Sequence, residues 1–315
     1  MGKSKEESAA KRYLRRPPQR LVLSPRVRWE YSIGQFPEDT PMQELPRPLA
    51  RFLFVVLACV IIPLAAHAAD DTPLTKEQIK QFLLTAEIIK SKTSSRGVTH
   101  PWRLTLSNGT ITQDASFQSI DEHKSEMKLA SGRVEFDFVD SYKYNIAAYQ
   151  LAELLGLDDM LPVYVERQWQ GKTGSLSLYF PVKIDDAERV EKKIEPPDPD
   201  KWNKQMYRIR VFDELIYDTD PNLTNVLIGE AWTIWRIDFS RAFRKNKELR
   251  VPTNLVKCDR QRFEKLKALK ADEVTEKTKN YLTKYEVNGV MARRDKIVAT
   301  FQTLIAEKGE KEVLY

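Results

Sequence analysis

Apolar side chains change their spacing several times along the chain, and each change predicts a new element. Residues 74–91 begin with a helical spacing and end in a β-prone run, so we expect a helix that gives way to a strand. Residues 100–121 predict two strands around a tight turn at Asn108 and Gly109, because an Asn-Gly pair adopts the backbone of a two-residue hairpin.

A helix and two more strands complete the first part of the chain. Residues 141–157 carry a helical stripe, which we expect Asp140 to cap and Gly156 to end. Residues 161–169 and 174–184 are β-prone and predict a second pair of strands. Together these elements indicate a small antiparallel sheet with one helix against it.

A proline-rich break at residues 194–202 separates this part from a different one. Downstream, residues 206–218 predict a helix, and the chain from Cys258 to its end has the charge pattern of exposed helices. The sequence therefore predicts an α+β protein with a sheet-rich lobe at 73–193, a linker, and a helical lobe at 203–315.

The start of the chain has the layout of a secretory leader. Residues 52–69 form a short apolar run that follows basic residues and ends in Ala-His-Ala, which predicts a signal peptide or an uncleaved membrane anchor. Residues 1–51 lack an apolar period and are expected to be disordered, or untranslated if synthesis begins at Met42. We expect an exported protein, periplasmic or secreted, that starts near Ala69 or Asp70, or else a membrane-anchored one.

Charge and residue usage exclude several kinds of chemistry. The net charge is +6, but residues 1–51 hold 11 Lys and Arg against 6 Asp and Glu, so the rest is nearly neutral and no nucleic-acid partner is expected. After the leader only Cys258 remains, which we expect to be a buried small side chain. Beyond His100 and His123 there is no histidine in this part, and no HExxH, CxxC or GxSxG motif occurs. Catalysis, if present, rests on carboxylates, amides and lysines.

Residues 217–243 place acidic and amide side chains in an apolar setting. Two β-prone runs around Gly229 predict a hairpin, which would bring Asn225 and Asp238 together at its open end. Such oxygen ligands suit a hard cation such as Mg²⁺, with Asp220 in the preceding loop facing whatever the cation holds. Taken singly, Asp220 and Asn225 are more typical of turn formers, whereas an unpaired Asp238 at the end of an apolar strand is costly.

The order Asp220, Asn225 and then Asp238 followed by Phe239 resembles the catalytic loop and metal-binding pattern of the protein-kinase-like superfamily. It is most similar to the atypical branches, the phosphatidylinositol 3- and 4-kinases and the secreted kinases related to Golgi casein kinase. The resemblance covers roughly residues 75–260 and implies a two-lobed kinase-like fold. It implies that Asp220 acts on the acceptor hydroxyl, while Asn225 and Asp238 hold Mg²⁺ or Mn²⁺ against the phosphates of ATP.

The same resemblance implies a nucleotide-binding loop at residues 90–100. Backbone N–H groups of Ser94, Ser95 and Gly97 would face the phosphates, and Arg96 would add positive charge.

Two residues depart from the kinase pattern. Where kinases carry a phosphate-binding Lys and a partnering Glu, this chain offers Gln118 and Asn145, two neutral amides that can hydrogen-bond to each other. The lost positive charge has three candidate replacements, Lys124, Lys128 and Lys143, between which the sequence does not decide.

Three functions remain open at this point. The first is an ATP-dependent phosphotransferase acting on a hydroxyl of a protein, a lipid head group or a sugar. The second is a pseudokinase that binds nucleotide or protein without efficient transfer, which the neutral amide pair favours. The third is an adaptor unrelated to kinases, whose helical lobe binds a protein.

Overall fold

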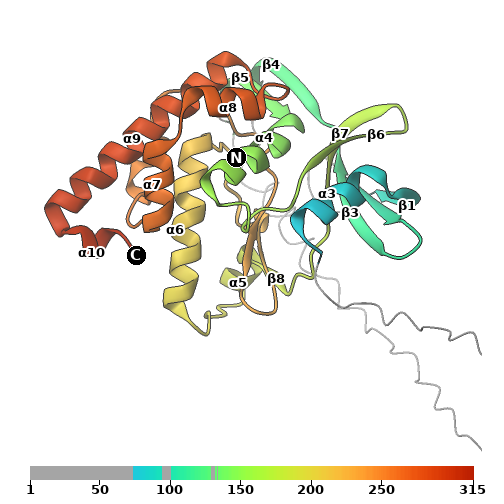
Figure 1. The fold of residues 1–315 in the computed structure, drawn as a ribbon, viewed down its shortest axis with the longest axis horizontal. Coiled ribbons are helices and arrows are strands. Elements are labelled where there is room, and N and C mark those ends of the chain that lie inside the picture. Colours follow the sequence, from blue (N-terminus) through green and yellow to red (C-terminus); the bar gives the residue numbers. More distant parts are fainter. Residues whose placement is uncertain (1–73, 94–100, 129–131, 133) are drawn as a thin grey trace, which may run out of the picture. The chain divides into compact units, whose positions relative to one another are not determined.

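The computed structural model describes residues 74–93, 101–128, 132 and 134–315. Figure 1 shows β1, β3, β6 and β7 gathered in one region and α6, α7, α8 and α9 in another. The first region consists of α3 (Lys76–Thr85), β1 (Glu87–Thr93), β2 (Trp102–Ser107), β3 (Thr112–Gln118), β4 (Asp121–Lys128), β5 (Val134–Ser141), α4 (Lys143–Leu155), β6 (Val165–Trp169) and β7 (Lys172–Leu178). The second consists of β8 (Ile184–Asp185), α5 (Asp186–Glu191), α6 (Pro199–Ile216), η1 (Leu223–Asn225), β9 (Val226–Ile228), β10 (Ile234–Arg236), η2 (Pro252–Asn254), α7 (Arg260–Ala268), α8 (Ala271–Thr278), α9 (Lys284–Lys308) and α10 (Glu310–Val313). The predicted α+β class is confirmed.

The main sheet is antiparallel and has the strand order β1-β2-β3-β7-β6. A turn forms at Asn108 and Gly109 as predicted, but it is not a two-residue loop, because Ser107 pairs with Thr112. Within the loop, Asn108 Oδ1 accepts from the backbone of Thr110 and Ile111. Helix α3 precedes β1 as expected. Alternate residues of β2 and β3 are fully buried, which is the pattern of strands with one face on a core.

Helix α4 links the sheet to the helical region, because it contacts β6 and β7 as well as α7 and α8. Nine of its side chains are buried, so it is the most enclosed helix of the first region. Gly156 ends it in the left-handed conformation at φ 66°, as predicted.

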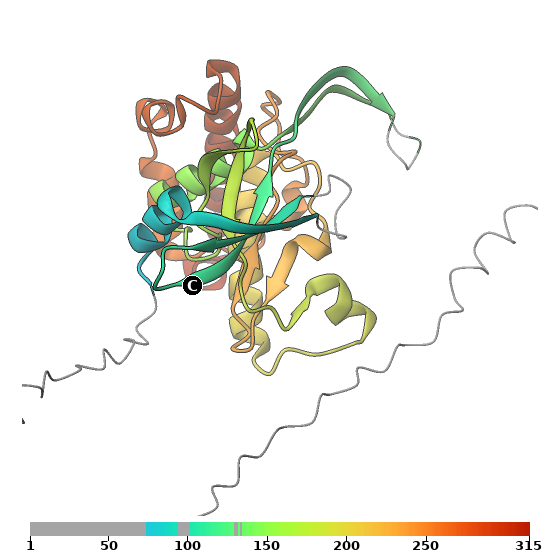
Figure 2. The ribbon, with the colours of Figure 1, turned by 90° about the vertical axis from the view of Figure 1, so that its right-hand side faces the viewer.

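The expectation that Asp140 caps α4 is wrong. The polar stretch before the helix forms a hairpin of β4 and β5, in which Asp140 pairs with Glu122. The residue at the N-terminal cap is Tyr142, which makes no side-chain capping bond. Figure 2 shows this hairpin projecting away from the other strands. Because almost all of β4 is exposed on both faces, no alternation of apolar residues announces it.

The helical region begins earlier than predicted. Helix α6 starts at Pro199, where Asp198 accepts a bond from Lys201 N–H, so residues 199–202 of the expected linker are helical. The short strand β8 pairs with β9, which in turn pairs with β10. Long helix α9 packs against α6, α7 and α8. Cys258 is buried there, as expected.

The expected disordered or untranslated segment 1–51 and the signal peptide or anchor at 52–69 lie outside the described residues. Among the residues that are described, no helix is both long enough and apolar enough to cross a membrane.

Candidate functional site

The hairpin of β9 and β10 forms as predicted and fixes one side of the candidate site. Ile234, Trp235 and Arg236 pair with Ile228, Leu227 and Val226 in turn. One step beyond the ladder, Ile237 N–H donates to Asn225 O at 2.9 Å. The backbones of Asn225 and of the residue before Asp238 are therefore direct neighbours, and both residues lie at the open end of the hairpin.

Asp238 has two properties that a purely structural residue rarely combines. Its φ is 59°, in the left-handed region that costs energy for a residue with a Cβ. Its Oδ1 is buried and has no hydrogen-bond partner among the described residues. The backbone N–H donates a long bond to the Tyr164 hydroxyl at 3.5 Å. A buried carboxylate oxygen without a partner is able to accept a hydrogen bond or to bind a cation.

Asp220 lies on a loop that a buried ion pair holds in place. Its backbone N–H donates to Asp218 Oδ1 at 3.0 Å, and Asp218 is paired with Arg236. Both Asp218 and Arg236 are 1% exposed. Burial raises the pKa of the Asp218 carboxyl while the Arg236 guanidinium lowers it. Breaking such a pair would leave an uncompensated buried charge, which is strongly destabilising.

The carboxylate of Asp220 faces outward from this anchored loop. Its side chain is 50% exposed and lies 3.6 Å from Arg241 Nη1. Thr219 fixes the neighbouring segment, because its N–H and hydroxyl donate to Arg241 O at 3.3 and 2.9 Å. An open cleft of about 440 Å³ reaches Thr219 and is lined also by Phe136 and Arg244. An exposed carboxylate beside an open cleft can reach a hydroxyl group brought in from solvent.

The two amides that replace the kinase ion pair are in contact. Asn145 Nδ2 donates to Gln118 Oε1 at 2.6 Å and to Ser175 Oγ at 3.2 Å. Asn145 Oδ1 accepts from Phe239 N–H at 2.7 Å. One buried side chain on α4 thus holds β3, β7 and the residue that follows Asp238, so the position of α4 and the conformation at Asp238 depend on each other.

The structure does not describe the central residues of the expected nucleotide-binding loop. Ser94, Ser95, Arg96 and Gly97 lie outside the described residues.

Two of the three candidate lysines are engaged in ion pairs. Lys143 binds Asp121 at 2.8 Å, and Lys124 binds Glu122 at 2.6 Å. Neither ammonium group is therefore held ready for a phosphate in this arrangement.

The described residues contain no group of three or more His, Cys, Asp or Glu side chains placed to hold a metal ion. A Mg²⁺ site does not require such a group, because proteins often bind this ion through one or two carboxylates while phosphates and water complete its shell. Asn225 and Asp238 are the residues that would supply oxygen ligands of that kind.

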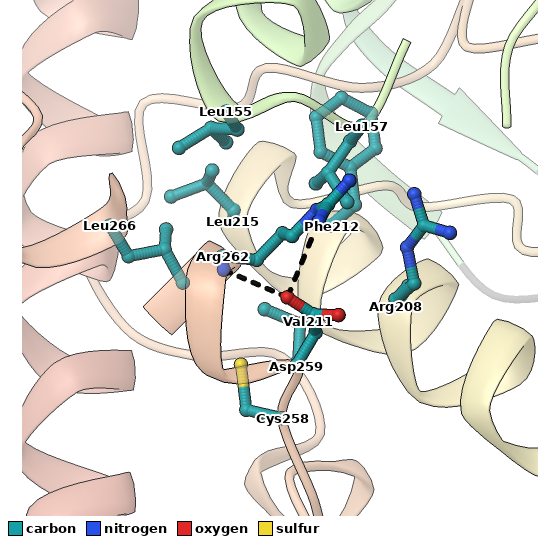
Figure 3. Close-up of a pocket in the computed structure, with 10 residues that line it drawn as sticks. All are labelled: Leu155, Leu157, Arg208, Val211, Phe212, Leu215, Cys258, Asp259, Arg262 and Leu266. Atoms are coloured by element: carbon teal, nitrogen blue, oxygen red, sulfur yellow. Dashed lines mark hydrogen bonds and ion pairs between the residues drawn. The ribbon is translucent and has the colours of Figure 1, made fainter. Parts of the chain in front are cut away.

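A cavity elsewhere in the helical region does not form a site. Figure 3 shows it between α6, α7 and the end of α4, lined mainly by apolar side chains, with the ion pair of Asp259 and Arg262 at its edge. Its volume is about 10 Å³. That is room for one water molecule at most.

No known family model matches this chain. No curated protein matches it either. Among solved structures, it is similar to a crystal structure of CtkA, a proinflammatory kinase of Helicobacter pylori. That match has a TM-score of 0.45 and 9% identity, and it covers 71% of this chain and 97% of the other. A likeness this weak says nothing of activity, which has to come from the geometry above.

The sequence did not identify three side chains near the site. Two of them are Asp218 and Arg236, and one feature of the sequence could have indicated them: Arg236 is a charged residue inside the apolar run WTIWRI, so it requires a buried partner. The third is Asp140, which belongs to β5 and precedes Ser141, whose N–H donates to Ser240 O in the segment after Asp238. Nothing local in the sequence marks that contact.

Proposed function

We propose that this chain is a kinase-like phosphotransferase, exported or tethered to a membrane, that moves the γ-phosphate of ATP to a hydroxyl acceptor with Mg²⁺ or Mn²⁺. The observation that supports it most is Asp238, whose backbone is strained and whose buried oxygen has no partner among the described residues. Asn225 lies beside it across the end of the hairpin, and Asp220 stands exposed on an anchored loop.

Each of these groups has a separate task in the proposed reaction. Bound metal would neutralise charge on the phosphates, and Asn225 and Asp238 would hold it. Asp220 would accept the proton of the attacking hydroxyl or orient it, since its carboxylate faces solvent. The ion pair of Asp218 and Arg236 would keep that carboxylate in position. The acceptor is a hydroxyl of a protein, a lipid head group or a sugar.

One observation favours a second function, a pseudokinase that binds nucleotide without efficient transfer. The pair Gln118 and Asn145 is neutral, so it offers no cation to the α- and β-phosphates. Of the three lysines that could compensate, Lys124 and Lys143 are engaged with carboxylates, which leaves Lys128 as the third candidate.

Thermal unfolding with nucleotide tests whether either function applies. A ligand that binds only the folded chain raises the melting temperature, so ATP with Mg²⁺ should raise it. Asp238→Asn should abolish that rise, while Asp137→Asn, an exposed carboxylate on β5, should leave it unchanged. A wild-type chain that shows no rise at millimolar ATP and metal would refute the kinase and the nucleotide-binding pseudokinase, and the adaptor function would become the better one.

Asp220→Ala separates transfer from binding. This residue acts on the acceptor, so nucleotide binding should stay near the wild-type value while turnover falls on the order of 10²-fold or more. Asn225→Ala should weaken binding and turnover together, because it removes a metal ligand. Asn222→Ala is the matched control, since it removes only an exposed turn bond to Thr224 in the same loop. Transfer that survives Asp220→Ala undiminished would show that the chemistry lies elsewhere.

A further inference from the structure

The open cleft that reaches Thr219 has a basic wall that the proposed reaction does not use. This wall comes from residues 244–250, of which four are basic and one is acidic. The acidic residue, Glu248, is already paired with Lys296 of α9. Arg250 lines the cleft, and its guanidinium has no hydrogen-bond or ion-pair partner among the described residues. This side of the cleft therefore attracts negative charge.

The opposite wall is an open edge of strand β5. Among the described strands, β5 pairs only with β4. Near the end of β5 the other edge is covered, because Ser141 N–H donates to Ser240 O at 2.8 Å. Arg244 Nη1 donates to Val139 O on the same strand at 2.8 Å. Residues 134–137 instead line the cleft. Successive side chains of a strand point to opposite faces, so a cleft that touches four residues in a row follows the edge of the strand.

The lining of the cleft also offers apolar surface and an excess of positive charge. Phe136 is 73% exposed and Val134 is 43% exposed. Of the charged side chains that line the cleft, three are basic and two are acidic. One of the acids, Glu135, is shared by Arg241 at 2.6 Å and Arg244 at 2.8 Å. A ligand that carries both carboxylates and small apolar side chains therefore matches this lining.

We propose that this cleft binds an extended acidic segment of a partner protein, which lies along the edge of β5 with its carboxylates facing residues 244–250. An extended peptide adds to an open strand edge through main-chain hydrogen bonds, which a lipid head group or a sugar cannot form. The bound segment would pass Thr219, next to the loop that carries Asp220. The inference goes beyond the proposed function, because binding requires neither nucleotide nor transfer.

Fluorescence anisotropy of the full chain with a labelled peptide of alternating glutamate and valine tests the proposal. The peptide should bind with an affinity that falls as salt is added, and a peptide with lysine in place of glutamate should not bind. Arg250→Glu should weaken binding at least about tenfold, because it places a negative charge opposite those of the peptide. The matched control is Lys80→Glu on α3, which reverses the same charge at an exposed residue outside the cleft and should bind like wild type.

Two further measurements test the apolar contact and the strand edge. Phe136→Ala should weaken binding, and because this side chain is largely exposed, the variant serves if Arg250→Glu does not fold. Methylation of alternate backbone nitrogens in the peptide removes the donors that would pair with β5, so the methylated peptide should bind less tightly.

The inference is overturned if the acidic peptide does not bind, if the folded variants bind it as tightly as wild type, or if the methylated peptide binds equally well. Binding of vesicles that contain phosphatidylinositol phosphate in place of the peptide would assign the cleft to a lipid and would also overturn it. Failure of the proposed function gives a different result: the peptide binds, but ATP with metal does not raise the melting temperature. If only this inference fails, ATP raises the melting temperature and the peptide does not bind.

Discussion

Replacing Asn145 with alanine removes three buried hydrogen bonds at once. Those bonds join α4 to Gln118 and Ser175 on the sheet and to Phe239 N–H beyond the hairpin. The loss of an acceptor for the buried Phe239 N–H costs about 1–3 kcal/mol, and the two other bonds contribute about 0.5–1.5 kcal/mol each. We therefore expect Asn145→Ala to lower the free energy of unfolding by about 2–6 kcal/mol, a large part of the roughly 5–15 kcal/mol that stabilises an ordinary domain.

Urea unfolding measures this loss directly, and the midpoint should fall while the slope stays constant. Gln118→Ala and the double variant complete a cycle, in which contact between the two amides predicts a coupling of about 0.5–3 kcal/mol. Gln150→Ala on the same helix is the control, because its buried Oε1 has no partner among the described residues and its removal should cost little. A loss below about 1 kcal/mol in Asn145→Ala, or an additive cycle, would refute this account of how α4 is held.

Three further expectations concern titration, reactivity and processing. Burial is the main cause that raises the pKa of Asp213 to about 7, so the folded chain keeps a proton that the unfolded chain has lost. The free energy of unfolding should therefore fall as the pH rises from about 4 to about 7. Asp213→Asn should remove this fall from a plot of the urea midpoint against pH. If the variant shows the same fall as wild type, other groups cause it. Burial also raises the pKa of the Cys258 thiol to about 12. In a Cys59→Ser chain, Cys258 should therefore resist iodoacetamide at pH 8 until urea unfolds the protein. Fast labelling of the native state would contradict this expectation. N-terminal sequencing of exported protein should give a start near Ala69 or Asp70, whereas a retained apolar run would indicate an anchor.

Local patterns in the sequence determined the order of elements and part of the site. The turn at Asn108, the end of α4 at Gly156 and the hairpin around Gly229 each depend on backbone preferences of a few neighbouring residues, so they could be predicted without tertiary information. The same hairpin placed Asn225 beside Ile237, the residue before Asp238, because its register is fixed by two short apolar runs. Spacing along the chain was sufficient for these features.

Only the tertiary structure decided which distant side chains share the site. The contact of Gln118 with Asn145 was expected from resemblance, but that Asn145 also binds Phe239 N–H follows from how α4 packs. Strand β4 is exposed on both faces and leaves no period in the sequence, so the sequence does not reveal that Asp140 belongs to the partner strand β5 and not to a helix cap. Its approach to the segment after Asp238 joins residues about a hundred positions apart. Such contacts depend on the packing of whole elements against one another, and the identity of neighbouring residues does not encode them.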